Sequence, residues 1–239
     1  METGKLIVER TKKLSKDVSS VNFSFDGFIY NPLDYAWQPH KAFLERYVNH
    51  EVKTLFLGMN PGPFGMMQTG VPFGEINAVK NYLHICEKVG VPASQHPKRL
   101  ICGFDLKRSE ISGLRLWNLI QTSYPNADDF FREHTVFNYC PLAFISSSAT
   151  AKNITPDSLV KCERDALDKV CLEYLSDIIK LLKPSFLIGV GKYAEKKLSE
   201  VAEGQVVASI VHPSPGNPMA NNGWAEKTLK QLKEIGIWN

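Results

Sequence analysis

The sequence lacks the long apolar run that a membrane-spanning helix needs. Its apolar stretches, such as residues 186–190, are far shorter than the roughly 20 residues that cross a bilayer. The N-terminal segment METGKLIVERTKKLSKD carries charges where a secretory signal peptide has its apolar stretch. We therefore expect an intracellular protein with no membrane partner.

Patterned cysteines are also missing. None of the five cysteines belongs to a Cys-x-x-Cys pair or has a partnered histidine, which argues against a disulfide framework and against a zinc site. Neither glycine fingerprint for phosphates, GxxxxGK[ST] or GxGxxG, is present. We expect no metal and no cofactor.

The chain has little excess charge of either sign. Its 28 basic and 25 acidic residues leave a net charge of +3, which permits a nucleic-acid partner without requiring one. There is no internal repeat and no low-complexity linker. A chain of 239 residues can bury one substantial core. We predict a single domain over residues 1–239, with residues 1–50 packed on its outside, and a monomer by default.

Four short segments have the composition of buried β-strands. Their apolar residues run continuously instead of alternating, as in strands that are covered on both faces. Helix-like segments lie around them, and alternation of this kind predicts an α/β fold: a three-layer sandwich with a central, mostly parallel, four-stranded sheet. The predicted strands cover residues 53–57, 134–138, 185–190 and 205–211. The predicted helices cover residues 40–48, 77–89, 156 to about 182, 192–201 and 225–235.

Each predicted strand ends in residues that suit a binding site better than a core. Ligands bind outside the carboxyl ends of parallel strands, so these ends would meet at one edge. The first strand runs into a loop, residues 58–74, with five glycines, three prolines and no charge. The second ends at Asn138, the third in Gly-Val-Gly-Lys, and the fourth at His212, before Pro-Ser-Pro-Gly-Asn-Pro. We expect Asn60, Phe73, Asn138 and His212 to line one pocket.

Each of these signals also has an ordinary structural explanation. A Gly/Pro-rich segment is by default only a loop, although this one is unusually long and apolar. An isolated Asn is more often a cap or turn residue. Yet the amide of Asn138 pairs a donor with an acceptor, which matches O4 and N3–H of uracil. An isolated histidine is more often structural, and the irregular segment that follows His212 makes it a stronger candidate.

Two long motifs resemble those of the single-strand-selective monofunctional uracil-DNA glycosylases. Residues 59–66 (MNPGPFGM) and 68–75 (QTGVPFGE) resemble the first motif of this family. Residues 212–215 (HPSP), continued by 217–218 and 220–224, resemble the second. Further similarity lies in residues 30–37, 112–117, 138–142 and 153–156, so that the resemblance runs from about residue 25 to the C-terminus.

The resemblance implies an enzyme of base excision repair that flips a damaged base out of DNA. Asn60 would position the attacking water, and His212 would donate to O2 of the departing base. Asn138 would read the pyrimidine edge and Phe73 would stack on the ring. The rest of the pocket wall, near C5 of the base, would be formed by Met59, Gly62, Phe64 and Gly65.

The resemblance also implies that residues 213–224 insert into the duplex. Position 216 is Gly where vertebrate members of the family have Arg, so the wedge would lose a cation that could fill the gap or contact phosphate. In the wedge, the DNA-contacting residues would be Pro213, Ser214, Pro215, Gly216 and Asn217. Three basic residues lie close together in the sequence: Lys107, Arg108 and Arg115. They either contact DNA phosphates or form an ordinary solvated charged surface.

The implied chemistry breaks an N-glycosidic bond through a cationic sugar and an anionic base. Other uracil glycosylase families have Asp where this chain has Asn60, and an amide orients water but does not accept its proton well. We therefore expect a stepwise hydrolysis. No lysine lies inside the two motifs, so no Schiff-base lyase step is expected.

Three alternatives stay open at the level of sequence. The first is a glycosylase of the same superfamily that acts mainly on another deaminated base, such as xanthine. The second is a lesion-binding protein without turnover, against which the presence of both Asn60 and His212 argues. The third is a hydrolase of free nucleosides, which would not need the inserting segment 213–224.

Overall fold

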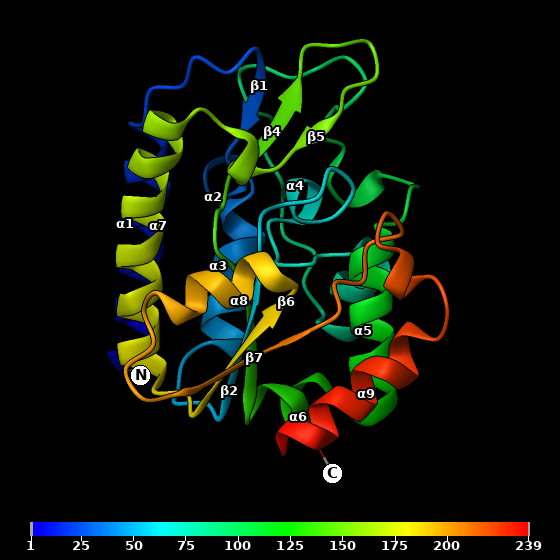
Figure 1. The fold of residues 1–239 in the computed structure, drawn as a ribbon. Helices are drawn as coiled ribbons and strands as arrows, with labels where there is room; N and C mark the ends of the chain where they lie inside the picture. The colour runs from blue at the N-terminus through cyan, green and yellow to red at the C-terminus, as the bar shows by residue number, and fades with distance from the viewer. Residues whose placement is uncertain (1, 239) are drawn as a thin grey trace.

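A four-stranded parallel sheet forms the centre of the computed structural model, which describes residues 2–238 (Figure 1). The strand order is β3-β2-β6-β7, and every neighbouring pair is parallel. This confirms the predicted α/β fold and the four predicted strands, whose ends move by no more than one residue. The strands are β2 (Thr54–Gly58), β3 (His134–Asn138), β6 (Phe186–Val190) and β7 (Val206–Ile210).

Helices flank both faces of this sheet. Successive strand residues point to opposite faces, and Phe137 packs against Tyr174 of α7 whereas Phe56 packs against Phe130 of α6. Helices α7 and α8 form one outer layer, and α5, α6 and α9 form the other. In Figure 1, α7 lies to the left of the sheet, and α5 and α9 lie to its right. The helices are α5 (Ile111–Ser123), α6 (Ala127–Phe131), α7 (Lys161–Leu182), α8 (Lys192–Ser199) and α9 (Trp224–Ile235).

The N-terminal segment lies on the outside of α7. Helix α1 (Glu2–Ser19) packs against it, and the hydroxyls of Thr11 and Tyr174 lie 2.7 Å apart. A helix at 2–19 was not predicted, although its buried stripe has helical spacing, because charged residues surround that stripe. Helices α2 (Pro32–Tyr35) and α3 (Trp37–Tyr47) follow, so the helix predicted at 40–48 begins three residues earlier.

A second, antiparallel sheet was not predicted. It has the order β1-β4-β5, with β1 (Gly27–Tyr30), β4 (Ala143–Ser146) and β5 (Asn153–Ile154). These strands have two to four residues each, too few for a recognisable pattern. The sheet brings Asn153 and Thr155 to the carboxyl end of the central sheet.

The helix predicted at residues 77–89 forms only as far as Tyr82. Residues 76–82 are helical and include the π-helical turn η1 (Ala78–Tyr82), and the chain then leaves helical geometry at His84, which has a φ of +51°. The carbonyl of Leu83 accepts from Nη1 of Arg46 at 3.0 Å and from the hydroxyl of Tyr47 at 2.9 Å. Side chains from α3 thus satisfy the carbonyl that a longer helix would have used.

The helix predicted from residue 156 is divided in two. A 3-10 turn, η3 (Pro156–Ser158), precedes two extended residues, and α7 begins only at Lys161. Its predicted end is confirmed: Lys183 adopts a left-handed conformation, φ +47°, before Pro184. The remaining short helices are α4 (Met66–Thr69), η2 (Gly103–Asp105) and η4 (Pro218–Ala220). Within residues 2–238, no helix combines the length and apolar character needed to cross a membrane.

Candidate active site

A cavity of about 640 Å³ opens at the carboxyl ends of β2, β3 and β7. Most of the residues singled out from the sequence line it: Met59, Asn60, Gly62, Phe64, Phe73, Arg108, Asn138, His212, Ser214, Pro215, Gly216 and Asn217. Four of the residues singled out do not: Gly65, Lys107, Arg115 and Pro213. The parallel sheet therefore brings both sequence motifs to one place, as the argument from the strand ends expected.

Asn60 and Asn138 are held by strand pairing that continues beyond β2 and β3. The N–H of Tyr139 donates to the Gly58 carbonyl at 2.9 Å, and the N–H of Cys140 donates to the Met59 carbonyl at 2.9 Å. Beyond this pairing, Nδ2 of Asn60 donates to the Leu142 carbonyl at 3.3 Å. Its Oδ1 accepts no hydrogen bond from residues 2–238, so it is available to accept one from water.

Gly58 makes room for the side chains of Asn138 and Phe73. A Cβ atom at position 58 would lie 2.3 Å from Oδ1 of Asn138 and 2.6 Å from the Phe73 ring. The amide and the ring therefore converge on the same glycine. The only donation by Nδ2 of Asn138 within residues 2–238 goes to the Met66 sulfur at 3.1 Å, and sulfur is a weak acceptor.

Phe73 has an unusual backbone conformation, with a φ of +52°. Its carbonyl accepts a hydrogen bond of 2.9 Å from the indole nitrogen of Trp117, which is fully buried. A non-glycine residue with positive φ persists only where its surroundings hold it. Trp117 of α5 therefore fixes the orientation in which Phe73 meets the cavity.

The loop after β2 is held by the buried side chain of Gln68. Its Nε2 donates to the carbonyls of Pro63 at 3.2 Å and Leu100 at 3.1 Å. Its Oε1 accepts from the N–H groups of Cys102 at 2.9 Å and Gly103 at 3.1 Å. These four hydrogen bonds hold the Gly/Pro-rich segment against the segment around residues 100–103.

His212 is placed by the ends of β6 and β7 together. Gly191, with a φ of +97°, follows β6, and a Cβ atom there would lie 3.2 Å from Cβ of His212. In the Gly-x-Gly-Lys segment noted in the sequence, the missing side chain of the second glycine thus leaves space for His212. The N–H of Ser214 donates to Nδ1 of His212 at 3.1 Å, and burial lowers the pKa of the imidazole. The ring is therefore neutral at neutral pH, with its proton on Nε2.

Side chains also hold the segment that follows His212. The Trp224 indole donates to the Val211 carbonyl at 2.7 Å, and Nδ2 of Asn217 donates to the His212 carbonyl at 3.1 Å. Arg115 donates to the Pro213 carbonyl at 2.8 Å. Arg115 therefore supports this loop from α5, and its Nη1 is engaged within the protein.

Arg108 is an exposed cation at the cavity. Its guanidinium carbon lies 4.0 Å from the ring centroid of Phe64, which also lines the cavity. Arg99 approaches the same ring at 5.2 Å, but it donates to the carbonyls of Lys98 and Thr150. Of the two arginines, Arg108 is the one without a hydrogen bond or ion pair to residues 2–238.

Several cavity residues were given no role from the sequence, although some of them lie inside the family motifs. Glu110 is the single carboxylate among the lining residues; its Oε2 accepts from the Gly113 N–H at 2.6 Å and so caps α5. Burial raises the pKa of Glu110, although the hydrogen bonds from Gly113 and Ser112 act in the opposite direction. The capping position just before a helix was its only sequence signal. The other such residues are Pro63, Met66, Ser109, Ile111, Ser112, Asn153 and Thr155.

Comparison with known proteins gives consistent matches. Residues 45–234 match the family model of the uracil DNA glycosylase superfamily. The chain is 40% identical over 235 residues to the single-strand selective monofunctional uracil-DNA glycosylase of Rattus norvegicus, covering 96% of this chain and 84% of the relative. The protein of the same name from Mus musculus is 39% identical over 235 residues, with the same coverage.

A solved structure supports the fold independently. Wild-type SMUG2 of Pedobacter heparinus superposes with a TM-score of 0.64 at 19% identity, covering 95% of this chain and 98% of that one. Because the identity is low, this likeness bears on the fold alone. The family model and the relatives at about 40% identity span nearly the whole chain. The chain belongs to the uracil-DNA glycosylase superfamily and, within it, to the single-strand selective monofunctional family.

Proposed function

We propose that this chain removes uracil from DNA by hydrolysing the bond between base and deoxyribose, which leaves an abasic site. One observation carries the proposal: His212, whose Nδ1 accepts from the Ser214 N–H at 3.1 Å, shares a cavity with Asn60 and Asn138. A donor for the departing base, a residue that can hold water and an amide that can read a pyrimidine edge are the groups that this reaction requires.

His212 stabilises the leaving base in this proposal. As the glycosidic bond lengthens, negative charge develops on O2 of the base, and Nε2–H of His212 donates to it. A preorganised donor of this kind contributes about 10²–10³ in rate. A neutral donor suits the role because its proton stays on the protein and the base departs as an anion.

Asn60 orients the attacking water. Its Nδ2 is tied to the Leu142 carbonyl, which leaves Oδ1 to accept from a water molecule. An amide does not take up the proton that this water loses, so water attacks a sugar that is already largely cationic. The path is stepwise: the base departs first, water adds to the anomeric carbon, and the proton is released to solvent.

Asn138 and Phe73 select the base. The Asn138 amide pairs with O4 and N3–H of uracil, while the Phe73 ring stacks on the flipped pyrimidine. Met59, Gly62 and Phe64 form part of the cavity wall beside these two residues. C5-modified and other deaminated bases are further substrates in this proposal.

The DNA backbone is bound around the cavity mouth. The segment containing Pro213, Ser214, Pro215, Gly216 and Asn217 enters the space left by the flipped nucleotide. Arg108 contacts a phosphate near the cavity, and the exposed Lys107 adds to the positive field. Arg115 acts on DNA through the loop that it holds.

Three other functions are less well supported. The names of the relatives favour uracil over xanthine as the main substrate. A lesion-binding protein would not need Asn60 and His212 together in one cavity. A nucleoside hydrolase would not need a preorganised loop beside the cavity.

A single assay separates these functions. The chain is incubated with an oligonucleotide that contains one uracil, and alkali then cleaves abasic sites; matched oligonucleotides carry xanthine or thymine, and free deoxyuridine is tested in parallel. We expect cleavage at uracil, weaker cleavage at xanthine, and no turnover of deoxyuridine. Binding to the uracil strand without cleavage, or turnover of the free nucleoside, would contradict the proposal.

A further inference from the structure

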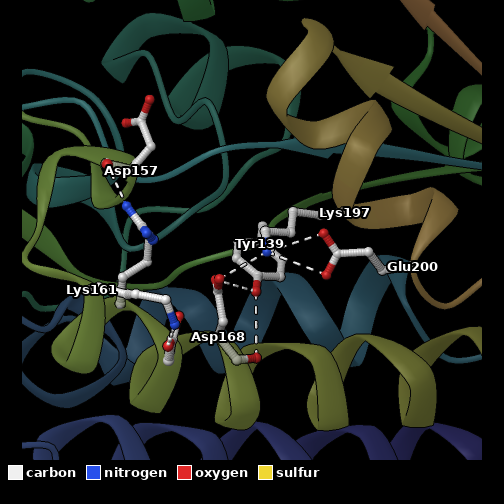
Figure 2. Close-up of polar contacts among 8 residues, drawn as sticks. Tyr139, Asp157, Lys161, Asp168, Lys197 and Glu200 are labelled. Carbon is white, nitrogen blue, oxygen red and sulfur yellow. Dashed lines mark hydrogen bonds and ion pairs between the residues drawn. The ribbon is translucent and has the colours of Figure 1, made fainter.

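An ionic network centred on Asp168 and Lys197 lies between α7 and α8, and it includes Tyr139, the residue that follows Asn138. The Tyr139 hydroxyl donates to Oδ1 of Asp168 on α7 at 2.6 Å. Nζ of Lys197 on α8 lies 2.8 Å from Oδ2 of Asp168 and 3.3 Å from Glu200. Figure 2 shows the four side chains converging between the two helices. None of them lines the cavity.

Stability alone does not account for this network. The side chain of Lys197 is 9% exposed and that of Asp168 is 17% exposed, so both charges have lost most of their hydration. Replacing such a pair by apolar residues of similar volume is often neutral or stabilising. Burial and the hydrogen bond to Asp168 strongly raise the pKa of Tyr139, which therefore remains a protonated donor.

Tyr139 is joined to the cavity by one peptide bond. Its neighbour Asn138 points to the opposite face, since successive residues of an extended strand alternate. Asn138 itself is weakly held, because its amide donates only to the sulfur of Met66 within residues 2–238. The location of the amide is therefore set by the backbone, which is anchored by the Tyr139 N–H on Gly58 and by the Tyr139 side chain.

We propose that Tyr139 is a positioning residue: its hydroxyl, held by Asp168 and Lys197, sets the location of the Asn138 amide in the cavity. This inference rests on the proposed function, in which Asn138 reads the base. A hydrogen-bonded ring on one face of the strand end fixes the amide on the other. It does so without occupying any of the space in which the base binds.

The first measurement is single-turnover excision from DNA by the full chain. Oligonucleotides carry uracil or 5-fluorouracil, whose base leaves more readily and keeps slow variants measurable. Tyr139→Phe should lower the rate by about 5- to 50-fold, the range for a lost positioning hydrogen bond. Asp168→Asn keeps an oxygen that accepts from Tyr139, so its excision rate should fall less than that of Tyr139→Phe.

Tyr193→Phe is the matched control. The Tyr193 ring packs edge-on against Tyr139 at 6.0 Å, and Lys197 lies 6.0 Å from it, yet its buried hydroxyl has no hydrogen-bond partner within residues 2–238. Removing this hydroxyl changes the same cluster without breaking the link to Asp168. Its excision rate should stay within about twofold of the wild-type rate, a much smaller reduction than that expected for Tyr139→Phe.

A double-mutant cycle separates positioning from general destabilisation. In an Asn138→Ala background, Tyr139→Phe should cost less than about twofold, because the side chain that it positions is gone. An equal loss in both backgrounds, or a loss for Tyr193→Phe as large as that for Tyr139→Phe, would overturn the inference. If Tyr139→Phe does not fold, the cycle is run with Asp168→Asn. Wild-type protein that excises no uracil would overturn the proposed function, and this inference with it.

Discussion

The backbone N–H of Ser214 donates to Nδ1 of His212 at 3.1 Å. Because an imidazolium has no free acceptor, this bond and the lowered pKa of His212 both favour the neutral ring. The proton is consequently on Nε2, the nitrogen that the proposed mechanism directs at the departing base. The backbone of Ser214 thus favours one tautomer of His212, at the start of the loop that we propose contacts DNA.

The buried histidines make stability depend on pH. Burial lowers the pKa of His40 and of His134 to about 4. Between pH 6.5 and pH 4 the unfolded chain therefore binds more protons than the folded one, and the free energy of unfolding falls as the pH falls. For His40 the loss from neutral pH to pH 5 should be about 2 kcal/mol.

Urea unfolding at pH 7.5 and pH 5 measures this loss. Replacing His40 by Gln keeps a donor for the Gly70 carbonyl, which lies 2.7 Å from Nδ1 of His40. Between pH 7.5 and pH 5, the free energy of unfolding of this variant should fall by about 2 kcal/mol less than that of the wild type. The same pH dependence in both proteins would mean that His40 is not the titrating group.

Exchanging the amide of Asn138 for a carboxylate should weaken uracil excision. Asn138→Asp replaces a donor by an acceptor at the base edge, and losing a paired hydrogen bond in a dry pocket costs about 1–3 kcal/mol. Excision of uracil should fall accordingly, and slow excision of cytosine should appear. Single-turnover rates on both bases measure this. Unchanged uracil kinetics would show that Asn138 does not read the base.

Adding one methyl group at Gly58 should damage the site strongly. The Cβ atom of Gly58→Ala would overlap both Oδ1 of Asn138 and the Phe73 ring, at 2.3 and 2.6 Å. Both groups must move, so we expect excision to fall by at least about 100-fold, more than stability alone would explain. Excision rates well below the melting temperature test this. An active Gly58→Ala variant would mean that the amide and the ring do not act from these locations.

Arg108 should account for about one phosphate contact. Arg108→Ala should weaken DNA binding to all sequences alike, and it should reduce the slope of log affinity against log salt by about one. Arg10→Ala is the control. Arg10 lies on α1 and is paired with Asp177 at 3.4 Å, so its loss should leave the slope unchanged. Titrations at several salt concentrations distinguish the two. Equal slopes for wild type and Arg108→Ala would show that Arg108 makes no phosphate contact.

Most of the fold could be predicted from four apolar segments. Strands covered on both faces have continuous apolar residues, and their parallel arrangement brings Asn60, Asn138 and His212 together. The antiparallel sheet could not be predicted, because β5 has only two residues. Residues 153–156 were noted as resembling the family, but the place of Asn153 and Thr155 in the cavity was not predicted.

The errors at residues 77–89 and at Glu110 have a common cause. Local pattern does not reveal which side chain from elsewhere will satisfy a backbone group. Arg46 and Tyr47 take the carbonyl of Leu83 and end a helix that the local sequence favours. Glu110 takes the N–H of Gly113 and is thereby fixed at the cavity, although only residues on either side of it were given a role from the sequence.

The most direct test of the mechanism is the response of rate to leaving-group acidity. Single-turnover excision is measured for uracils with substituents of graded electron withdrawal at C5, using the wild type, His212→Ala and Asn60→Ala. If His212 stabilises the departing base, His212→Ala should lower the excision rate most for bases that are poor leaving groups. The dependence of rate on leaving-group acidity should therefore become steeper. If Asn60 acts on the water, its loss should lower all rates by a similar factor. Parallel slopes for all three proteins would mean that His212 holds the base without stabilising its charge, and would contradict the mechanism.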